Sequence, residues 1–187
     1  RNGPRPFAMP PGTHSHKVRV ENGVMVVNHE LNGADPSPVP PEFRPGVGIY
    51  DVSAPAKPRL ITRWGMTGKG VHRFDLDNRY AYLSATMEGY VGTIVLILDL
   101  KDPARPQEAG RWWMPGQWIA GGEKPTWTAD RHRCHHPLRL GGGASAWTRR
   151  RAWCRRPSPI PASAPGSCTT AGSRRGGCSC AASWPAP

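Results

Sequence analysis

The sequence predicts an all-β protein, and three observations lead to that prediction. Glycine and proline contribute 22 residues each to a chain of 187, about twice their usual share, and so many would interrupt a helical bundle. Apolar and polar residues alternate in several short stretches, which is the period of a half-buried strand. No window of a dozen residues keeps helical spacing without a proline or glycine. The longest purely apolar run, residues 94–98, is also far shorter than the roughly 20 residues that cross a membrane.

The first expected strands form a hairpin. Val18 and Val20 alternate with basic residues, and an Asn22-Gly23 turn then leads into the apolar run at 24–27. Asn-Gly between two such stretches is a strong hairpin signal, because both residues tolerate the positive φ of a tight turn. Further strands are expected at 74–76, at 80–84 after a turn at 78–79, and at 94–100, and a proline-rich surface loop is expected at 33–45.

An internal repeat organises these strands. Residues 48–64 (GIYDVSAPAKPRLITRW) and 96–112 (LILDLKDPARPQEAGRW) are identical at seven of 17 positions at an offset of 48. In each copy an apolar strand ends in an aspartate, Asp51 or Asp99, whose carboxylate can accept backbone N–H bonds in the following turn. A four-stranded sheet with its turns takes about 40–50 residues, the period of a β-propeller blade. The repeat therefore predicts a partial β-propeller of about two to three four-stranded blades within residues 13–140.

Histidines occur in phase with the hairpins. His16 opens one hairpin and His72 the next, and a third copy begins at His135 or His136, between which the spacing does not choose. Blades around an axis would bring these side chains into a ring, and neutral imidazoles are good ligands for Zn, Cu or Fe. We therefore expect them to be metal ligands, with hydrogen bonding to backbone at the blade entrance as the alternative role. The remaining histidines, His14, His29 and His132, lie outside this spacing and are expected to be surface or loop residues.

Five blocks of the sequence resemble a known family. They are GIYDVSAPAKPRL, GVHRFDLDNRYAYLSATMEGY, ILDLKDPARPQEAGRWWMPGQ, AGGEKPTW and HHPLRLG. These blocks are similar to the LVIVD-repeat proteins, which are bacterial and archaeal β-propellers, and more distantly to the selenium-binding protein (methanethiol oxidase) propellers. The resemblance implies a propeller of roughly seven blades, of which this chain would hold about two and a half. By analogy with the distant relatives, the histidines in phase with the hairpins would bind metal on the channel axis.

Four other residues are candidates for a ligand pocket at the channel mouth: Arg73, Trp113, Glu123 and Trp127. Glu123 follows two glycines in a predicted loop and can serve as a general base, although a solvated loop carboxylate is the simpler interpretation. The tryptophans fit a pocket wall and also fit packing between blades.

Residues 141–187 differ sharply from the rest of the chain. They contain seven arginines but no lysine, aspartate or glutamate, and almost no large apolar residue, so we expect a disordered tail. One interpretation is an arginine-rich arm for nucleic acid. Another is a metal site on the four cysteines of the tail, although their spacing matches zinc sites poorly. We favour a third, translation of GC-rich DNA out of frame, because a selected basic arm would mix lysine with arginine.

Together these features predict a truncated LVIVD-like propeller with an irregular segment at 1–12 and the tail at 141–187. The expected function is metal-dependent and oxidoreductase-like, with Cu, Zn or Fe held by the axial histidines, and we expect no activity from this chain alone. One alternative is a non-catalytic scaffold that binds a small molecule or a protein at a propeller face. The least favoured alternative is nucleic-acid binding through the tail. No signal peptide is visible, but the sequence looks as if it begins within a blade, so the localisation stays open with the cytoplasm as the weaker expectation.

Overall fold

The structure is a computed structural model that describes residues 9–33, 39–127 and 133–140, together with the backbone of three further strands. These strands are β11 (Gly143–Trp147), β12 (Ser167–Thr169) and β13 (Ala181–Ser183). The described residues contain no α-helix and one 3-10 turn, η1 (Ile119–Gly121), so the predicted all-β class is confirmed. No helix in this part of the chain is long and apolar enough to cross a membrane.

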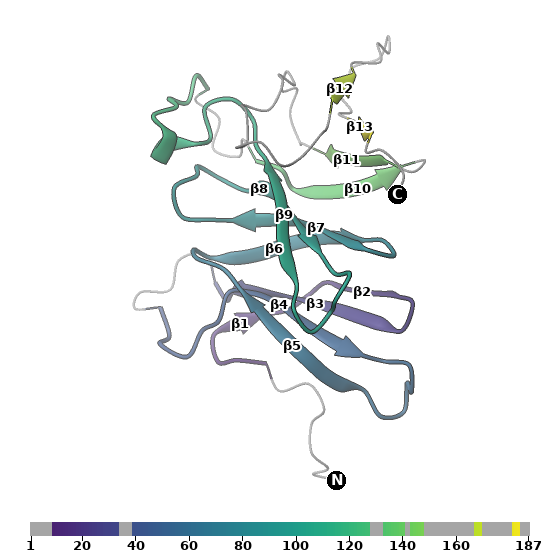
Figure 1. Ribbon diagram of the computed structural model, residues 1–187. Coiled ribbons are helices and arrows are strands. Elements are labelled where there is room, and N and C mark those ends of the chain that lie inside the picture. The colour runs from purple at the N-terminus through teal and green to yellow at the C-terminus, as the bar shows by residue number, and fades with distance from the viewer. Residues whose placement is uncertain are drawn as a thin grey trace.

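Two successive four-stranded antiparallel meanders make up most of the fold (Figure 1). The first meander consists of β2 (Val18–Glu21), β3 (Val24–Leu31), β4 (Gly46–Asp51) and β5 (Arg59–Gly65). The second meander consists of β6 (Gly70–Leu76), β7 (Tyr80–Thr86), β8 (Ile94–Asp99) and β9 (Gln107–Trp112). One residue pair, Glu30 with Gly70, joins β3 to β6, so the strands form one strongly curled sheet, a half-barrel. A short strand, β1 (Thr13–His14), adds to the end of β3.

Turn chemistry explains the two hairpins predicted from the sequence, and both are present. Asn22 and Gly23 have positive φ angles of 48° and 76°, as the tight turn between β2 and β3 requires. Between β6 and β7, Oδ1 of Asp77 accepts hydrogen bonds from the backbone N–H groups of Arg79 at 2.8 Å and Tyr80 at 2.6 Å. Each turn thus satisfies its own backbone groups and brings the next strand back in register.

The aspartates that end β4 and β8 make the same contact in the turns that follow. Oδ1 of Asp51 accepts a hydrogen bond from the backbone N–H of Ser53 at 2.9 Å, and Oδ1 of Asp99 from that of Lys101 at 2.8 Å. This is the bonding predicted for these two aspartates. The strand pairs β4–β5 and β8–β9 also each contain a register shift two residues before the aspartate.

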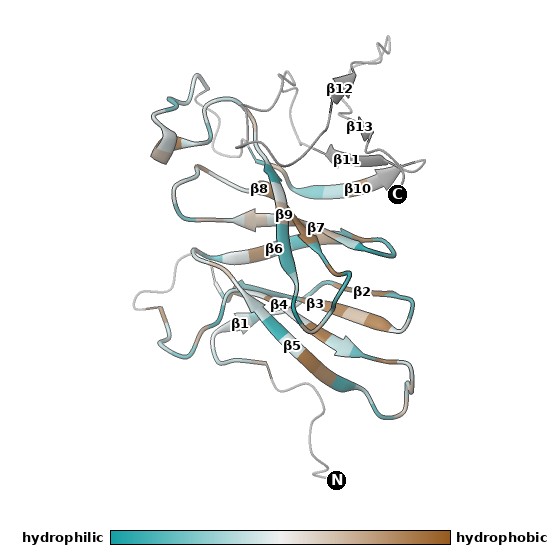
Figure 2. Ribbon diagram, in the orientation of Figure 1, coloured by the Kyte–Doolittle hydropathy of each residue, from teal (hydrophilic) through white to brown (hydrophobic). Residues whose placement is uncertain are grey.

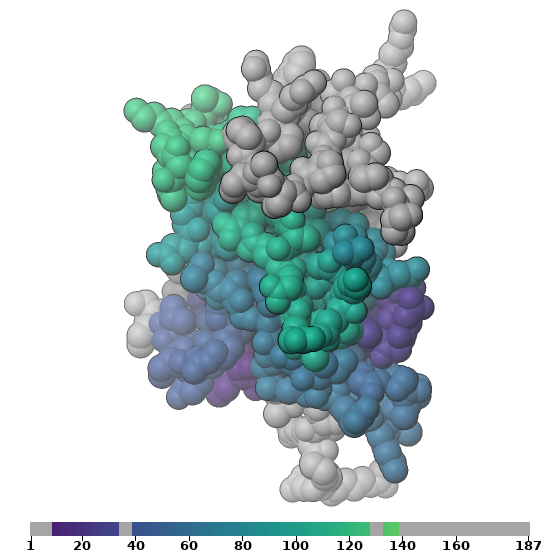
Figure 3. Space-filling view, in the orientation of Figure 1, coloured from purple at the N-terminus to yellow at the C-terminus, as the bar shows by residue number. Residues whose placement is uncertain are grey.

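The larger of two apolar clusters among the described residues spans both meanders. Its fully buried members include Val26, Val47 and Ile49 from the first meander and Phe74, Leu83, Ile94, Leu96 and Leu98 from the second. Figure 2 shows apolar stretches on the strands, for example along β5 and the β2–β3 hairpin, and Figure 3 shows the second meander stacked on the first. The next strand, β10 (His136–Leu140), packs against β6 and β7, with Cys134 buried just before it. The elements therefore follow one another in layers along the molecule.

Two predicted segments lie partly outside the described residues. Residues 39–45 contain no strand, as expected for the loop at 33–45, although Phe43 is 7% exposed and therefore belongs to the interior. Within 141–187 the structure describes only the backbone of β11, β12 and β13. The remainder of that range, with its arginines and most of its cysteines, lies outside the described residues, and its expected disorder stays a prediction.

Candidate metal centre

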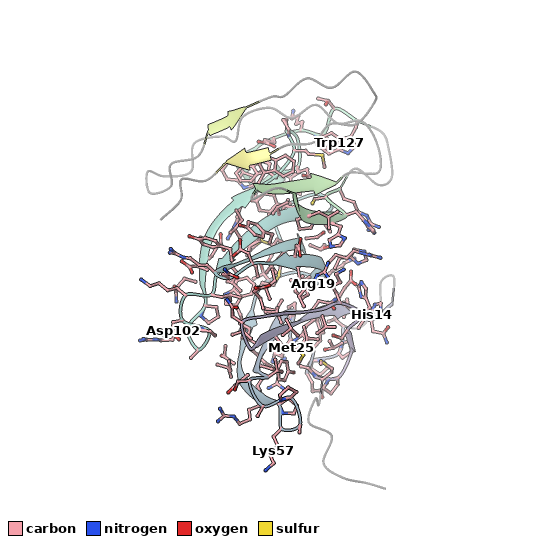
Figure 4. The ribbon with its side chains drawn as sticks, turned by 90° about the vertical axis from the view of Figure 1, so that its right-hand side faces the viewer. His14, Arg19, Met25, Lys57, Asp102 and Trp127 are labelled. Atoms are coloured by element: carbon pink, nitrogen blue, oxygen red, sulfur yellow. The ribbon has the colours of Figure 1, made fainter. Side chains whose placement is uncertain are left out.

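Four histidine rings from three segments form a continuous row, which we call the imidazole row. It runs from His14 in β1 to His16, then to His72 in β6, and ends at His135 just before β10. The ring centroids of successive members lie 4.6, 5.1 and 5.0 Å apart. Figure 4 shows His14 at one edge of the molecule, opposite the edge that carries Asp102. The structure thus brings together three histidines in phase with the hairpins and adds His14, which is outside that spacing.

A carboxylate lies beside the row. The two carboxylate oxygens of Glu30 lie 2.9 and 3.0 Å from Nδ1 of His72, and Oε2 lies 3.8 Å from Nδ1 of both His14 and His16. Because an ionised carboxylate only accepts hydrogen bonds, His72 carries a proton on Nδ1 in this contact. Ligand atoms of His14, His16 and Glu30 all lie within 4.8 Å of one another. Two imidazoles and one carboxylate are a donor set that suits zinc and iron.

Backbone pairing explains why these residues meet. Glu30 is paired with His14 of β1 on one side and with Gly70 of β6 on the other. His72 lies where the pairing of β6 with β7 shifts register, and such a bulge re-aims a side chain away from simple alternation. The sequence analysis missed Glu30 because a glutamate next to the last residue of a strand looks like an ordinary exposed position.

The row becomes more exposed toward His14. The side chain of His14 is 50% exposed, compared with 25% for His16, 21% for Glu30 and 20% for His72. Burial lowers the pKa of His16, and the neighbouring His72 and His14 lower it further, whereas Glu30 raises it. A lowered pKa keeps His16 neutral at neutral pH, and the neutral ring is the form that binds metal. The outer end of the row therefore combines available lone pairs with access from solvent.

The ring of His136 does not continue the imidazole row. Its Nε2 lies 3.3 Å from the carbonyl oxygen of Phe74, and burial, followed by the charge of Lys17, lowers its pKa. Of the two alternatives left open by the spacing, His135 is the one whose ring continues the row. The charge of Arg73, a pocket candidate, lowers the pKa of His136 and also that of His16 in the row.

The other three pocket candidates lie in the loop that follows β9. Glu123 accepts hydrogen bonds from Nε1 of Trp113 at 3.2 Å and from the backbone N–H groups of Gly116 at 2.7 Å and Trp118 at 3.1 Å. Trp127 covers Gly116, where an added Cβ would lie 2.6 Å from the indole ring. In Figure 4 Trp127 lies at the top of the molecule, apart from the outer end of the imidazole row. In this arrangement the carboxylate of Glu123 holds its own loop together.

His29 corrects one expectation from the sequence. It was expected on the surface or in a loop, but it lies in β3 and is 1% exposed. Burial, followed by the charge of Arg63, lowers its pKa to about 4, and Nε2 has no hydrogen-bond partner among the described residues. The expectation failed because strand alternation turns His29 to the face opposite Asn28 and Glu30, where its ring is buried beside Gly48 of β4. His132 lies outside the described residues.

Comparisons with protein-family models, with curated proteins and with solved structures find no match to this chain. The resemblance to LVIVD-repeat propellers therefore stays an interpretation of the sequence blocks. The candidate metal centre depends on its own geometry, and its donor set is two imidazoles and a carboxylate with a third imidazole bonded to that carboxylate.

Proposed function

We propose that this chain binds a divalent transition metal, with His14, His16 and Glu30 as ligands and His72 holding the Glu30 carboxylate. The observation that carries the proposal is the convergence of the three ligand atoms to within 4.8 Å of one another. His72 would act as an outer partner, because its Nδ1 contacts both oxygens of the carboxylate and so fixes its orientation. Zinc and iron match this donor set, and copper also accepts imidazole ligands.

The open end of the row supports a catalytic role for the metal. Three protein ligands with a position open to water or substrate are typical of catalytic centres, whereas structural zinc sites are closed by four. The half-exposed side chain of His14 leaves room for such a position. Two histidines and one carboxylate are the ligand set of non-haem iron oxygenases and also of some hydrolytic zinc enzymes, so this donor set is compatible with the oxidoreductase-like function. The metal would supply the redox or Lewis-acid chemistry, and the chain would supply the ligands and the accessible face.

We also propose that the two meanders are successive blades of an LVIVD-like β-propeller. Both have four antiparallel strands, both contain a register shift at the same distance from an aspartate, and both aspartates bond to the backbone two residues later. In such a ring the imidazole row would lie near the axis, where each blade contributes the histidine that opens its first hairpin and β1 adds His14.

Titration of the full chain with Co²⁺ tests the metal site, since histidine-bound Co²⁺ absorbs visible light. We expect one ion per chain, displaced by Zn²⁺. Removal of an outer partner of a ligand already costs about 10- to 100-fold in affinity, so His16→Ala, which removes a ligand, is expected to cost at least as much. His136→Gln is the matched control, because its ring is bonded to the Phe74 carbonyl. Absence of stoichiometric binding, or equal binding by His16→Ala, would refute the site and favour a non-catalytic scaffold.

A further inference from the structure

The side chain of Asn28 lies between two of the segments that carry the imidazole row. It is fully buried in β3. Its Oδ1 accepts hydrogen bonds from the backbone N–H groups of His16 at 3.0 Å and Lys17 at 2.8 Å. Its Nδ2 donates to the carbonyl oxygen of Val71 at 2.9 Å and, at longer range, to that of His72 at 3.4 Å. One amide thus connects the backbone around His16 to the backbone around His72.

The backbone of Asn28 also forms hydrogen bonds to the segment at residues 15–17. Its carbonyl oxygen accepts a hydrogen bond from Oγ of Ser15 at 2.6 Å, and its N–H donates to the carbonyl oxygen of Lys17 at 3.2 Å. Residues 15–17 therefore have bonds to Asn28 from both their side chains and their backbone, although they belong to no strand. A buried amide that loses its partners costs about 1–3 kcal/mol, so this arrangement is strongly favoured over one in which the segment moves away.

We propose that Asn28 is the positioning residue of the imidazole row. It sets the separation of His16 from His72, whose ring centroids lie 5.1 Å apart, and thereby keeps Glu30 within reach of both. The effect of Asn28 on metal affinity rests on the proposed metal site. The effect of Asn28 on the arrangement of the rings does not rest on that site, because this arrangement can be measured without metal.

The second meander contains a simpler version of this contact. Ser84 occupies the corresponding place in β7, and its hydroxyl donates to the carbonyl oxygen of Cys134 at 2.6 Å. Cys134 directly precedes His135, so both Asn28 and Ser84 bond to the residue before a histidine of the row. The serine is too short to hold a second segment as well. The longer amide is found at the end of the row where the proposed ligands converge.

The test uses Asn28→Ala and Asn28→Ser in the full chain. Serine is the residue present at position 84, so we expect Asn28→Ser to fold even if the alanine variant does not. The ring centroids of His16 and His72 lie 5.1 Å apart, close enough for a nuclear Overhauser effect between their ring protons. If the row opens, this effect should weaken in the NMR spectra of the metal-free variants. Co²⁺ affinity should fall about 10- to 100-fold, as for loss of an outer partner.

Gln117→Ala is the matched control, because the two buried amides have similar partners. Oε1 of Gln117 accepts the backbone N–H of Met114 at 2.8 Å, and Nε2 donates to the carbonyl oxygens of Val91 at 2.8 Å and Thr93 at 3.2 Å. This variant should lose similar stability but leave the nuclear Overhauser effect between the rings of His16 and His72 and the Co²⁺ affinity unchanged.

Three outcomes separate the two proposals. A weakened Overhauser effect between the rings of His16 and His72 in the Asn28 variants alone supports the positioning role, even where wild-type protein binds no Co²⁺ and the metal site fails. An unchanged Overhauser effect and unchanged affinity in Asn28→Ser overturn the positioning role and leave the metal site standing. Equal changes in Gln117→Ala also overturn it, since they would reflect general loosening of the fold.

Discussion

Gly70 approaches His29 so closely that a Cβ at position 70 would lie 2.1 Å from the carbonyl oxygen of His29. Gly70 also has a φ of 93°, which residues other than glycine rarely adopt. It is paired with Glu30 in the one residue pair that joins β3 to β6. A strained backbone and a steric clash together make this position intolerant of any side chain.

We expect Gly70→Ala to lower the free energy of unfolding by more than about 2 kcal/mol, measured by urea denaturation. Gly110→Ala in β9 is the control, because its φ is ordinary and no atom lies within 4 Å of an added Cβ. That change should shift stability by less than about 1 kcal/mol. Equal effects of the two substitutions would show that β3 and β6 are not in close contact at Gly70.

The burial of His29 predicts that stability falls as the pH falls. Its pKa is lowered to about 4 in the folded protein, below the ordinary value of 6.5, so between these values the unfolded chain binds the extra proton. Above about pH 6.5 the ring is neutral in both states and does not change the free energy of unfolding. That free energy falls by about 3 kcal/mol as the pH approaches 4. Urea unfolding at several pH values should show a flatter profile for His29→Gln than for the wild type. Parallel profiles would mean that His29 titrates normally.

The close approach of the rings in the imidazole row predicts that replacing His72 changes the pKa of His16. His72 is, after burial, the largest of the influences that lower the pKa of His16. His72→Gln removes that charge, so the pKa of His16 should rise, as followed by its ring proton in NMR spectra. His136→Gln should have no such effect, because His136 is not among the groups that shift His16. A His16 titration unchanged in His72→Gln would contradict the close approach of these two rings.

Cys134 predicts a protected thiol. Burial raises its pKa to about 12, and its carbonyl oxygen accepts hydrogen bonds from Ser84 and Thr93, which hold it against the second meander. A buried, protonated thiol reacts slowly, because the thiolate is the nucleophile. Iodoacetamide at pH 8 should leave Cys134 unmodified in native protein and modify it in urea, as peptide mass mapping would show. Rapid native labelling would mean that the segment around Cys134 is not packed as described.

Much of the strand order could be predicted because the relevant physics is local. The Asn22-Gly23 turn and the capping carboxylates of Asp51 and Asp99 depend on neighbours within a few residues, and these appear in the sequence. The convergence of His16 with His72 could be anticipated from their matching positions in successive hairpins.

The remaining features of the site depend on long-range pairing. His14 joins the row because β1 pairs with the end of β3, and no spacing rule reveals a two-residue strand. Glu30 and Asn28 look like ordinary polar strand residues until the partner strands are known. That His135 and not His136 belongs to the row follows from packing against β6, where the ring of His136 contacts the carbonyl oxygen of Phe74.

The alternation of side chains at the end of β3 has a consequence for how this protein can change. Asn28 and Glu30 face the histidines, while His29 between them fills the interior. A deletion or insertion of one residue here would exchange the two faces, moving a carboxylate into the buried place of His29 and removing it from the histidines at once. The number of residues in this strand is therefore fixed by the requirements of both faces together.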